Sequence, residues 1–399
     1  MSALTNYRQL FLLPGAGRFF VPAALARLGV AMQSLAILWA VQGATGSFAI
    51  AGIATGAFAI TEALLAPQVA RFVDSHGQAS VAVFQLPVFG LAAATLVVAT
   101  SLHTPAWVWL MASAVAGVSC PQIGSLAAAR WRHLTDGTAQ ISTALALEAA
   151  VNTVTFMVGP VLVTSLSATI HPAMGLVIAT GLVVVFTASL VRCRESEPPR
   201  QARGPGLVLD ARLLDRALLP FPALHLLLGI YFGGTTICLT AAALSLGVAP
   251  YAGLIGAAGG VGGLLAGFVY GASSHRIGTG SAMLLGSAGL FLFCFGLSQS
   301  HGLVPLVLLS TLAGACVSPI VVPAAVKLQE AAPASLYVQA ITWTGSASAL
   351  GTAIAAPLIG QLVDERSAQA GYLAITGVLS LLLIVTVLLA RDRRLSPVP

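Results

Sequence analysis

The stretch GVSCP at residues 117–121 decides the fold, because GACVSP at residues 314–319 repeats its pattern about 198 residues later. The pair Ala-Gly at 51–52 recurs at 252–253, at an offset near half of the 399 residues. A tandem repeat of half the chain length predicts a protein built from two similar halves. When the repeated unit is very apolar, the pattern is typical of membrane transporters.

The composition supports a membrane protein. Hydrophobic residues make up 57% of the chain and charged residues only 8%, with a mean hydropathy of +0.94. Such a chain has too few charges to cover the surface of a soluble domain. The five cysteines form no CxxC or Cys/His cluster, so we expect neither a metal site nor a disulfide framework. The single lysine, Lys327, is followed by Leu328, which excludes a Walker A phosphate loop, and we expect no cofactor.

Apolar runs of about 20 residues or more are long enough to cross a bilayer as helices. We count twelve of them, which predicts an all-α membrane protein with twelve transmembrane helices in two six-helix pseudo-repeat halves. The predicted spans are 18–41, 47–70, 79–101, 105–129, 139–166, 172–192, 217–246, 251–273, 280–300, 303–326, 336–362 and 370–390.

The basic residues orient these spans. If the first residues are cytoplasmic, sixteen of the eighteen Lys and Arg residues fall on the cytoplasmic side, and the exceptions are Arg27 and Arg366. This follows the positive-inside rule and places both termini in the cytoplasm. The net charge of +6 is therefore a topology signal, and we expect no nucleic-acid partner. The Arg-, Ala- and Gly-rich composition favours a bacterial inner membrane.

Six spans per half mean that both halves enter the membrane in the same direction. We therefore predict a six-helix bundle over 1–192, a cytoplasmic linker over 193–216 and a second six-helix bundle over 217–399. The linker is rich in charge and proline, which predicts a solvated connection. We expect a monomer whose partners are the lipid bilayer, a small-molecule substrate and protons.

Short motifs lie at the ends of several spans. The loop ARFVDSHGQA at 70–79 and the sequence FMVGP at 156–160 are two of them, and ARW at 129–131 together with LE at 147–148 is the third. With these motifs the whole chain resembles the major facilitator superfamily of secondary transporters, in particular bacterial drug and metabolite exporters. The resemblance implies alternating access and a set of gating residues, although the basic positions that the family has after Asp74 are lost. These residues are Asp74, Gly77, Arg276, Gly278, Gly159 and Pro160.

Three charged residues lie inside predicted spans: Arg27, Glu62 and Glu148. Each costs about 2.5–3.5 kcal/mol at mid-helix, so a partner or a task is expected. Neighbouring antiparallel spans suggest an Arg27–Glu62 pair, either a structural brace or part of a charge relay. That pairing leaves Glu148 as an unpaired carboxylate for a proton or a cation. His225 holds the repeat position of Arg27, and it either joins the relay or is simply hydrogen-bonded.

Polar and aromatic side chains within the spans predict a largely apolar cavity with a few polar contacts. The candidate lining residues are Gln33, Trp39, Asn152, Thr155, Tyr231, Thr235, Gln339 and Trp343. A glycine stripe over 256–271 favours close helix contact, either where the halves move against each other or in ordinary packing.

We therefore expect a secondary active transporter, a proton-coupled exporter of small organic molecules. The main alternative is a metabolite importer or uniporter without proton coupling. A membrane-embedded enzyme and a transporter-like sensor remain further alternatives, although no HExxH or GxSxG motif is present, and we expect no catalytic residue.

Overall fold

The computed structural model describes residues 8–102, 104–135, 140–200, 218–273, 278–332 and 337–391. These residues are almost entirely helical, and no strand occurs among them, which confirms the predicted all-α fold. Helices satisfy their backbone hydrogen bonds internally, as a chain in lipid requires. Twelve helical segments of the described chain are long and apolar enough to cross a membrane.

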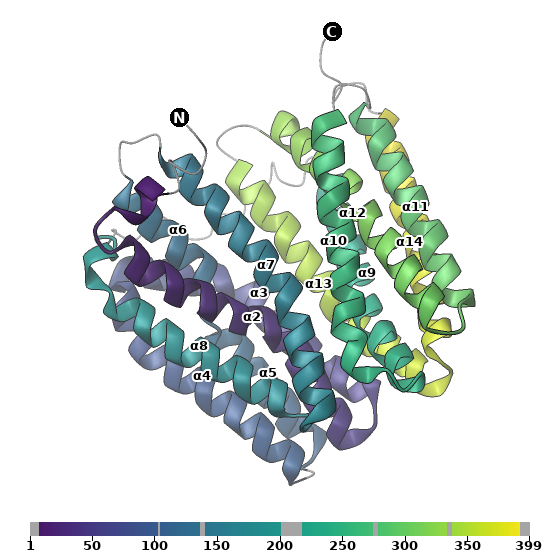
Figure 1. The fold of residues 1–399 in the computed structure, drawn as a ribbon, viewed down its shortest axis with the longest axis horizontal. Coiled ribbons are helices and arrows are strands. Elements are labelled where there is room, and N and C mark those ends of the chain that lie inside the picture. The colour runs from purple at the N-terminus through teal and green to yellow at the C-terminus, as the bar shows by residue number, and fades with distance from the viewer. Residues whose placement is uncertain are drawn as a thin grey trace. The chain divides into compact units, whose positions relative to one another are not determined.

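Seven long helices in the described part of the first half form its six spans, because the fourth span is made of two. Their arrangement can be followed in Figure 1. They are α2 (Ala16–Thr45), α3 (Phe48–His76), α4 (Gln78–Ser101), α5 (Ala106–Ser119), α6 (Ile123–Leu134), α7 (Gln140–Thr169) and α8 (Met174–Arg192). The short helix η1 (Arg194–Ser196) follows. The second half comprises α9 (Pro220–Ser245), η3 (Ala249–Tyr251), α10 (Ala252–Ser273), α11 (Thr279–Gln299), α12 (Leu303–Ala331), α13 (Tyr337–Glu365) and α14 (Ala368–Arg391).

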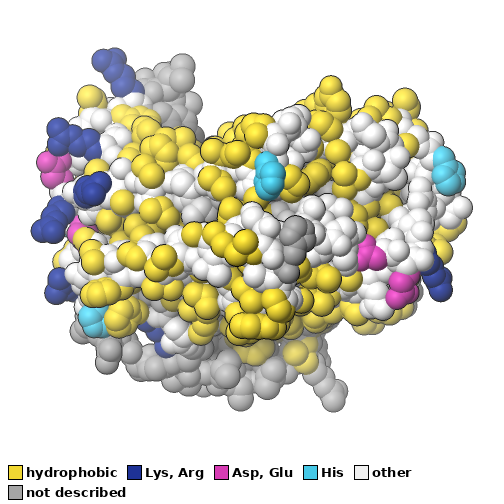
Figure 2. Space-filling model, turned by 90° about the horizontal axis from the view of Figure 1, so that it is seen from below, with side chains coloured by type: hydrophobic (Ala, Val, Ile, Leu, Met, Phe, Trp, Pro, Cys, Tyr) yellow, Lys and Arg dark blue, Asp and Glu magenta, His cyan; other side chains and the backbone are white. Residues whose placement is uncertain are grey.

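The surface of the protein is apolar. Phe84, Leu64 and Phe268 expose 77%, 67% and 70% of their surfaces, and many other large aliphatic side chains are also exposed. Figure 2 shows hydrophobic side chains spread over one face, with few charged ones among them. Helices that are apolar all round suit a lipid environment. The chain is a multi-pass membrane protein.

The chain divides into two compact units. Unit 1 holds Met1–Thr45 and Leu64–Gly206, and unit 2 holds Gly46–Ala63 and Leu207–Pro399. In unit 1, α2 packs against α7 and α8; in unit 2, α9 packs against α13 and α10 packs against α12. Residues 46–63, which include the first part of α3, group with the second half of the chain, and the predicted bounds of the two bundles and the linker stay a prediction.

The repeated stretch at residues 117–121 and 314–319 folds differently in its two copies. Pro121 separates α5 from α6, whereas Pro319 lies inside the continuous helix α12. Proline lacks an N–H group and interrupts the helical hydrogen-bond ladder. At the break in unit 1, the Gln85 side chain donates to the Cys120 carbonyl at 3.4 Å and supplies part of the missing bonding.

The glycine stripe of α10 packs inside unit 2. A Cβ added at Gly259 would lie 3.1 Å from the Ser310 carbonyl of α12, and one at Gly263 would lie 3.0 Å from the Gly314 carbonyl. Ser318 of α12 also donates to the Gly263 carbonyl at 2.5 Å. These contacts match the packing alternative for the stripe, in which small residues let two backbones approach.

Candidate functional site

Two opposite charges meet inside unit 1. Arg27 of α2 and Glu148 of α7 are 6% and 8% exposed, and the Arg27 Nη2 atom forms an ion pair with Glu148 Oε2. The Arg27 Nη1 atom also donates to the backbone carbonyl of Glu148 at 3.1 Å. Two guanidinium nitrogens therefore bind one residue, which fixes the position of α2 on α7. Charge-assisted bonds of this kind are among the strongest in proteins.

The second oxygen of the same carboxylate has its own donor. Trp131 of α6 donates its indole N–H to Glu148 Oε1 at 2.8 Å. The Trp131 ring is wholly buried and packs edge-on against Phe19, with centroids 4.8 Å apart, and against Phe20 at 5.9 Å. Glu148 therefore joins three helices, and Phe19 and Phe20 pack on the tryptophan that donates to it. We call Arg27, Trp131 and Glu148 the charge cluster.

The expected Arg27–Glu62 pair was wrong, and so was the expectation of an unpaired Glu148. The three charged residues lie at similar depths in their spans. Depth therefore could not predict whether Glu62 or Glu148 pairs with Arg27. The packing of α2 against α7 makes the choice in favour of Glu148. Glu62 is half-buried and lies in the part of α3 that groups with unit 2.

His225 lies in α9 of unit 2 and is half-buried. Its Nδ1 atom lies 2.9 Å from the Phe221 carbonyl, one turn earlier in the same helix. This contact agrees with the simple hydrogen-bonded alternative. A part for His225 in the charge relay stays a prediction.

The predicted cavity residues differ in their surroundings. Four of them are buried: Gln33, Trp39, Thr155 and Tyr231. Asn152 is exposed, Thr235 and Trp343 are half-buried, and the side chain of Gln339 lies outside the described residues. Gln33 donates to the Thr180 hydroxyl of α8 at 3.3 Å, so this amide joins two helices of unit 1. A role in substrate binding stays a prediction for all eight residues.

Asp74, one of the gating candidates, borders a cavity of about 230 Å³ in unit 1 between α3, α4 and α6. Asp74 lines it together with Gln78, Gln122 and Arg132, and its side chain is exposed. A second cavity, of about 190 Å³, lies in unit 2 at the end of α9.

The first turn of α4 is bonded to a carboxylate from another part of the chain. Glu197 accepts from the Ala79 N–H at 3.0 Å. Gly77, which precedes α4, has a φ of 91°, a left-handed value that glycine adopts without strain.

The other gating candidates are placed as follows. Gly159 packs closely on α2, because a Cβ there would lie 3.4 Å from the Met32 side chain. Pro160 lies inside α7, which continues to Thr169. Gly278 directly precedes α11, and Arg276 lies outside the described residues. A gating role stays a prediction for all four.

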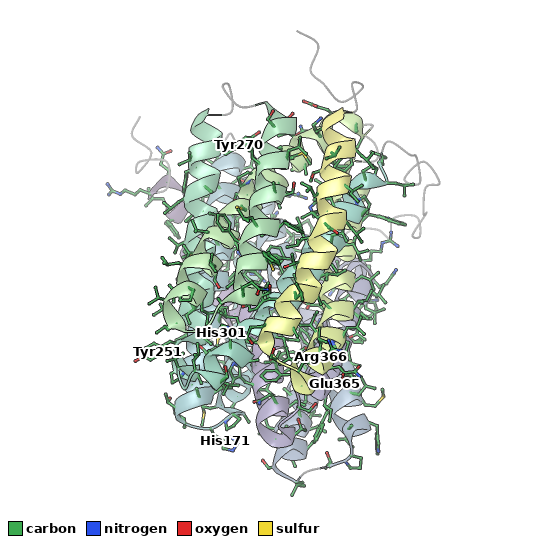
Figure 3. All side chains as sticks on the ribbon, turned by 90° about the vertical axis from the view of Figure 1, so that its right-hand side faces the viewer. His171, Tyr251, Tyr270, His301, Glu365 and Arg366 are labelled. Carbon is green, nitrogen blue, oxygen red and sulfur yellow. The ribbon has the colours of Figure 1, made fainter. Side chains whose placement is uncertain are left out.

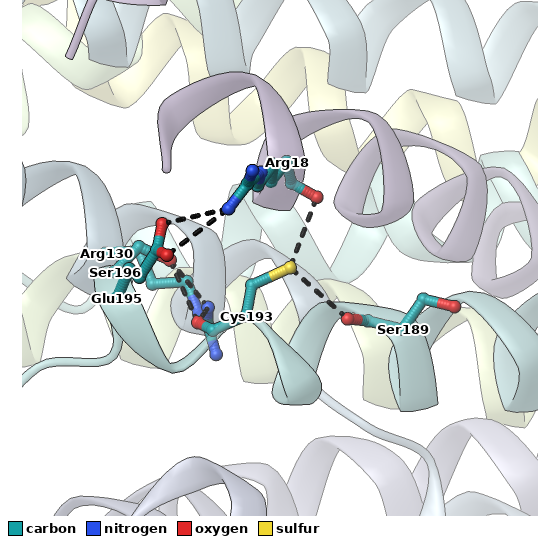
Figure 4. Close-up of polar contacts among 6 residues, drawn as sticks. All are labelled: Arg18, Arg130, Ser189, Cys193, Glu195 and Ser196. Carbon is teal, nitrogen blue, oxygen red and sulfur yellow. Dashed lines mark hydrogen bonds and ion pairs between the residues drawn. The ribbon is translucent and has the colours of Figure 1, made fainter. Parts of the chain in front are cut away.

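Arg130 of α6 is a buried arginine that the sequence did not predict to be buried. Arg130 has no exposed surface, and its Nε atom donates to Gln78 Oε1 of α4 at 2.7 Å. Its Nη1 atom donates to the Cys193 carbonyl at 2.6 Å and to the Ser196 hydroxyl at 2.7 Å (Figure 4). The sequence had offered Arg130 only as a topology residue. The motif ARW at 129–131, in which Arg130 precedes Trp131, was the feature of the sequence that could have indicated a structural role.

Residues 193–197, which we call the strap, were expected to be part of a solvated linker. Instead the strap is bonded to three helices: through Arg130 to α6, through Glu197 to α4, and through Glu195 to Arg18 of α2 at 3.2 Å. Figure 4 also shows the Cys193 thiol beside the Arg18 carbonyl, at 3.4 Å. The start of the predicted linker is thus an integral part of unit 1.

Lys327 of α12 is another buried cation, and its burial was not predicted from the sequence. It is 2% exposed, and its Nζ atom donates to the Leu389 carbonyl near the end of α14 at 3.2 Å. In the sequence repeat, Lys327 holds the position equivalent to that of Arg130.

The described residues contain no group of three or more His, Cys, Asp or Glu side chains that could hold a metal ion. No protein-family profile matches the chain, and no curated protein matches it in sequence.

Solved structures, however, share its fold. The nucleoside transporter NupG has a TM-score of 0.70 at 15% identity, with 93% of this chain and all of that one covered. A bacterial homologue of the iron transporter ferroportin, in an inward-facing state, has a TM-score of 0.74 at 13% identity, with 98% and 100% covered. The human organic anion transporter MFSD10 has a TM-score of 0.61 at 18% identity, with 94% and 99% covered. The chain therefore has the fold of the major facilitator superfamily of membrane transporters.

Proposed function

We propose that the protein is a secondary active transporter that exports small organic molecules in exchange for protons, and that Glu148 carries the proton. The observation that carries the proposal is the buried charge cluster inside a membrane-spanning unit. The transporters with similar folds support the class of activity. Orientation by the basic residues supports cytoplasmic termini in a bacterial inner membrane, with the strap on the inside.

A buried ion pair is a poor way to gain stability, because desolvation of both charges offsets their attraction. Apolar residues of similar size often do as well in such a place. In a membrane-spanning segment, charged side chains usually mark a pathway for ions or substrates. The Arg27–Glu148 pair therefore favours a task beyond bracing α2 against α7.

The geometry couples the charge on Glu148 to the position of α2. Arg27 stays protonated, so only the carboxylate of this pair can change its charge. Arg27 and Trp131 each donate to one oxygen of the carboxylate, so both oxygens are engaged in this conformation. In the proposed mechanism the proton reaches Glu148 after Arg27 has moved away. Proton binding and the α2–α7 contact thus exclude each other, which links protonation to a conformational change.

The test is flux in proteoliposomes with and without an imposed pH gradient, using a panel of small organic compounds. The Glu148→Gln variant keeps the size of the side chain but cannot carry a charge. We expect this variant to lose pH-driven accumulation and to keep exchange between equal substrate pools. Glu195→Gln is the matched control, because it removes an exposed carboxylate of the strap, and it should transport like the wild type.

Full pH-driven transport by Glu148→Gln would refute the role of Glu148. If the flux of the wild type does not depend on the pH gradient, the importer or uniporter alternative is favoured instead.

A further inference from the structure

The first turn of α3 is bound by a carboxylate more than 300 residues away in the chain. Asp364, one residue before the end of α13, accepts from the Phe48 N–H at 2.8 Å and from the Ala49 N–H at 2.9 Å. The Ser47 hydroxyl donates to the same carboxylate at 2.6 Å and accepts from the Ile50 N–H at 3.2 Å. Three N–H groups at the start of α3, which have no partner within the helix, are thus satisfied.

Below this cap the backbones of α3 and α13 touch. A Cβ at Gly52 would overlap the Ala356 carbonyl, and one at Gly56 would lie 2.8 Å from the Ala353 carbonyl. From the other side, a Cβ at Gly360 would overlap the Phe48 carbonyl. Backbone contact of this kind gives a close fit that is lost when the helices separate. All these contacts lie within unit 2.

Helix α3 is shared between the two units. Its residues up to Ala63 group with α13 and the rest of unit 2, whereas those from Leu64 onward group with unit 1. One continuous helix therefore has its first part bonded to one unit and its last part packed in the other. The contact between α3 and α13 therefore lies on a helix that belongs to both units.

We propose that Asp364 and the first turn of α3 form a latch that closes the outer side of the transporter and is released when that side opens. The inference rests on the proposed function for the orientation that places this end of the helices outside. The side chains of Glu365 and Arg366 mark the same end of unit 2, together with Tyr251 and His301, whereas Tyr270 marks the opposite end (Figure 3).

The cap suits a latch because it is strong and reversible. Asp364 is exposed, so water replaces its hydrogen bonds when the helices part. A carboxylate at a helix N-terminus is also attracted by the positive end of the helix dipole. The Ser47 hydroxyl and the N–H groups of Phe48 and Ala49 then lose their acceptor on α13 together, which makes release a single event.

The test measures the separation of α3 from α13 by electron–electron spin resonance in lipid nanodiscs. Spin labels are attached at Ile53→Cys and Leu358→Cys, two exposed positions on the facing helices, after the five native cysteines have been replaced. Wild-type transport and thermal stability in the cysteine-free chain confirm that it is intact. Ile53 lies beyond the first turn of α3, so fraying of that turn alone does not change this distance.

We expect Asp364→Asn to lower the ratio of closed to separated helices about five- to tenfold, the usual effect of losing a charged helix cap. Ser47→Ala, which removes one of the three bonds, should have a smaller effect in the same direction. Gly52→Ala should also separate the helices, because its methyl group meets the Ala356 carbonyl.

Glu365→Gln is the matched control. It removes the same charge one residue later, where the carboxylate accepts from Gln361 of its own helix at 2.8 Å. An unchanged distance distribution in Asp364→Asn would overturn the latch, and so would an equal shift in Glu365→Gln. The measurement needs neither a substrate nor a pH gradient, so its failure is distinct from a failure of the proposed proton coupling.

Discussion

Replacing Arg130 by alanine is expected to destabilise unit 1 more than any change at its exposed charges. The guanidinium makes three side-chain hydrogen bonds, to Gln78, the Cys193 carbonyl and Ser196, and it has no exposed surface. Each hydrogen bond to a charged group contributes about 1.5–3 kcal/mol. Three such bonds at the low end give about 4.5 kcal/mol.

The assay is reversible unfolding in mixed micelles of mild detergent and dodecyl sulfate, followed by tryptophan fluorescence. Arg18→Ala is the matched comparison, because Arg18 binds Glu195 of the strap at 3.2 Å while 76% of its side chain is exposed. An exposed pair of this kind contributes less than about 1 kcal/mol. Arg130→Lys keeps the charge but cannot bond with a planar fork, so we expect it to recover about half of the loss.

The result that refutes this reasoning is an Arg130→Ala variant that loses no more free energy of unfolding than Arg18→Ala. Water would then satisfy the partners of Arg130, and the strap would contribute little to unit 1. Equal stability of Arg130→Lys and the wild type would show that charge matters there and the shape of the guanidinium does not.

Two further predictions concern the charge cluster and the packing of unit 2. Trp131→Phe keeps an aromatic ring but removes the donor to Glu148, so pH-driven accumulation in proteoliposomes should fall, because the carboxylate loses one of the two side chains that position it; unchanged pH-driven accumulation would contradict this. Gly229→Ala should lower the free energy of unfolding by about 1–3 kcal/mol, because its Cβ overlaps the Ser348 carbonyl of α13. Gly345→Ala, where a Cβ meets nothing within 4 Å, is the control and should change stability by less than about 0.5 kcal/mol.

The helical fold could be predicted because membranes leave few options. A chain that is long, apolar and poor in charge must bury its backbone hydrogen bonds in helices, and the spacing of apolar runs then gives the number of spans. The fourth span shows the limit of that reasoning. Pro121 and Pro319 occupy the same place in the repeat, yet only the first interrupts a helix. Which proline breaks its helix depends on the surrounding packing, which the local sequence does not contain.

The site was only partly predictable. Arg27 and Glu148 could be chosen because charge inside an apolar span is costly wherever it lies. Their pairing was missed because depth along a helix says nothing about the direction in which a side chain points around it. Arg130 was missed for another reason: its position near the end of a span fits a solvated topology residue equally well. Its burial depends on the strap, which the sequence presented as a linker.

Two of the buried cations have a consequence for the history of the chain. Arg130 and Lys327 hold equivalent places in the two repeats, but one binds the strap and the other binds a carbonyl near the end of α14. Suppose that a single half-length ancestor was duplicated. The cation at the position of Arg130 and Lys327 then had one set of partners. Fusion of the two copies gave only the first copy a connecting segment to bind. The strap is then a contact that arose with the fusion itself. Separately expressed halves should therefore reassemble better when the break lies after residue 197 than when it lies before Cys193.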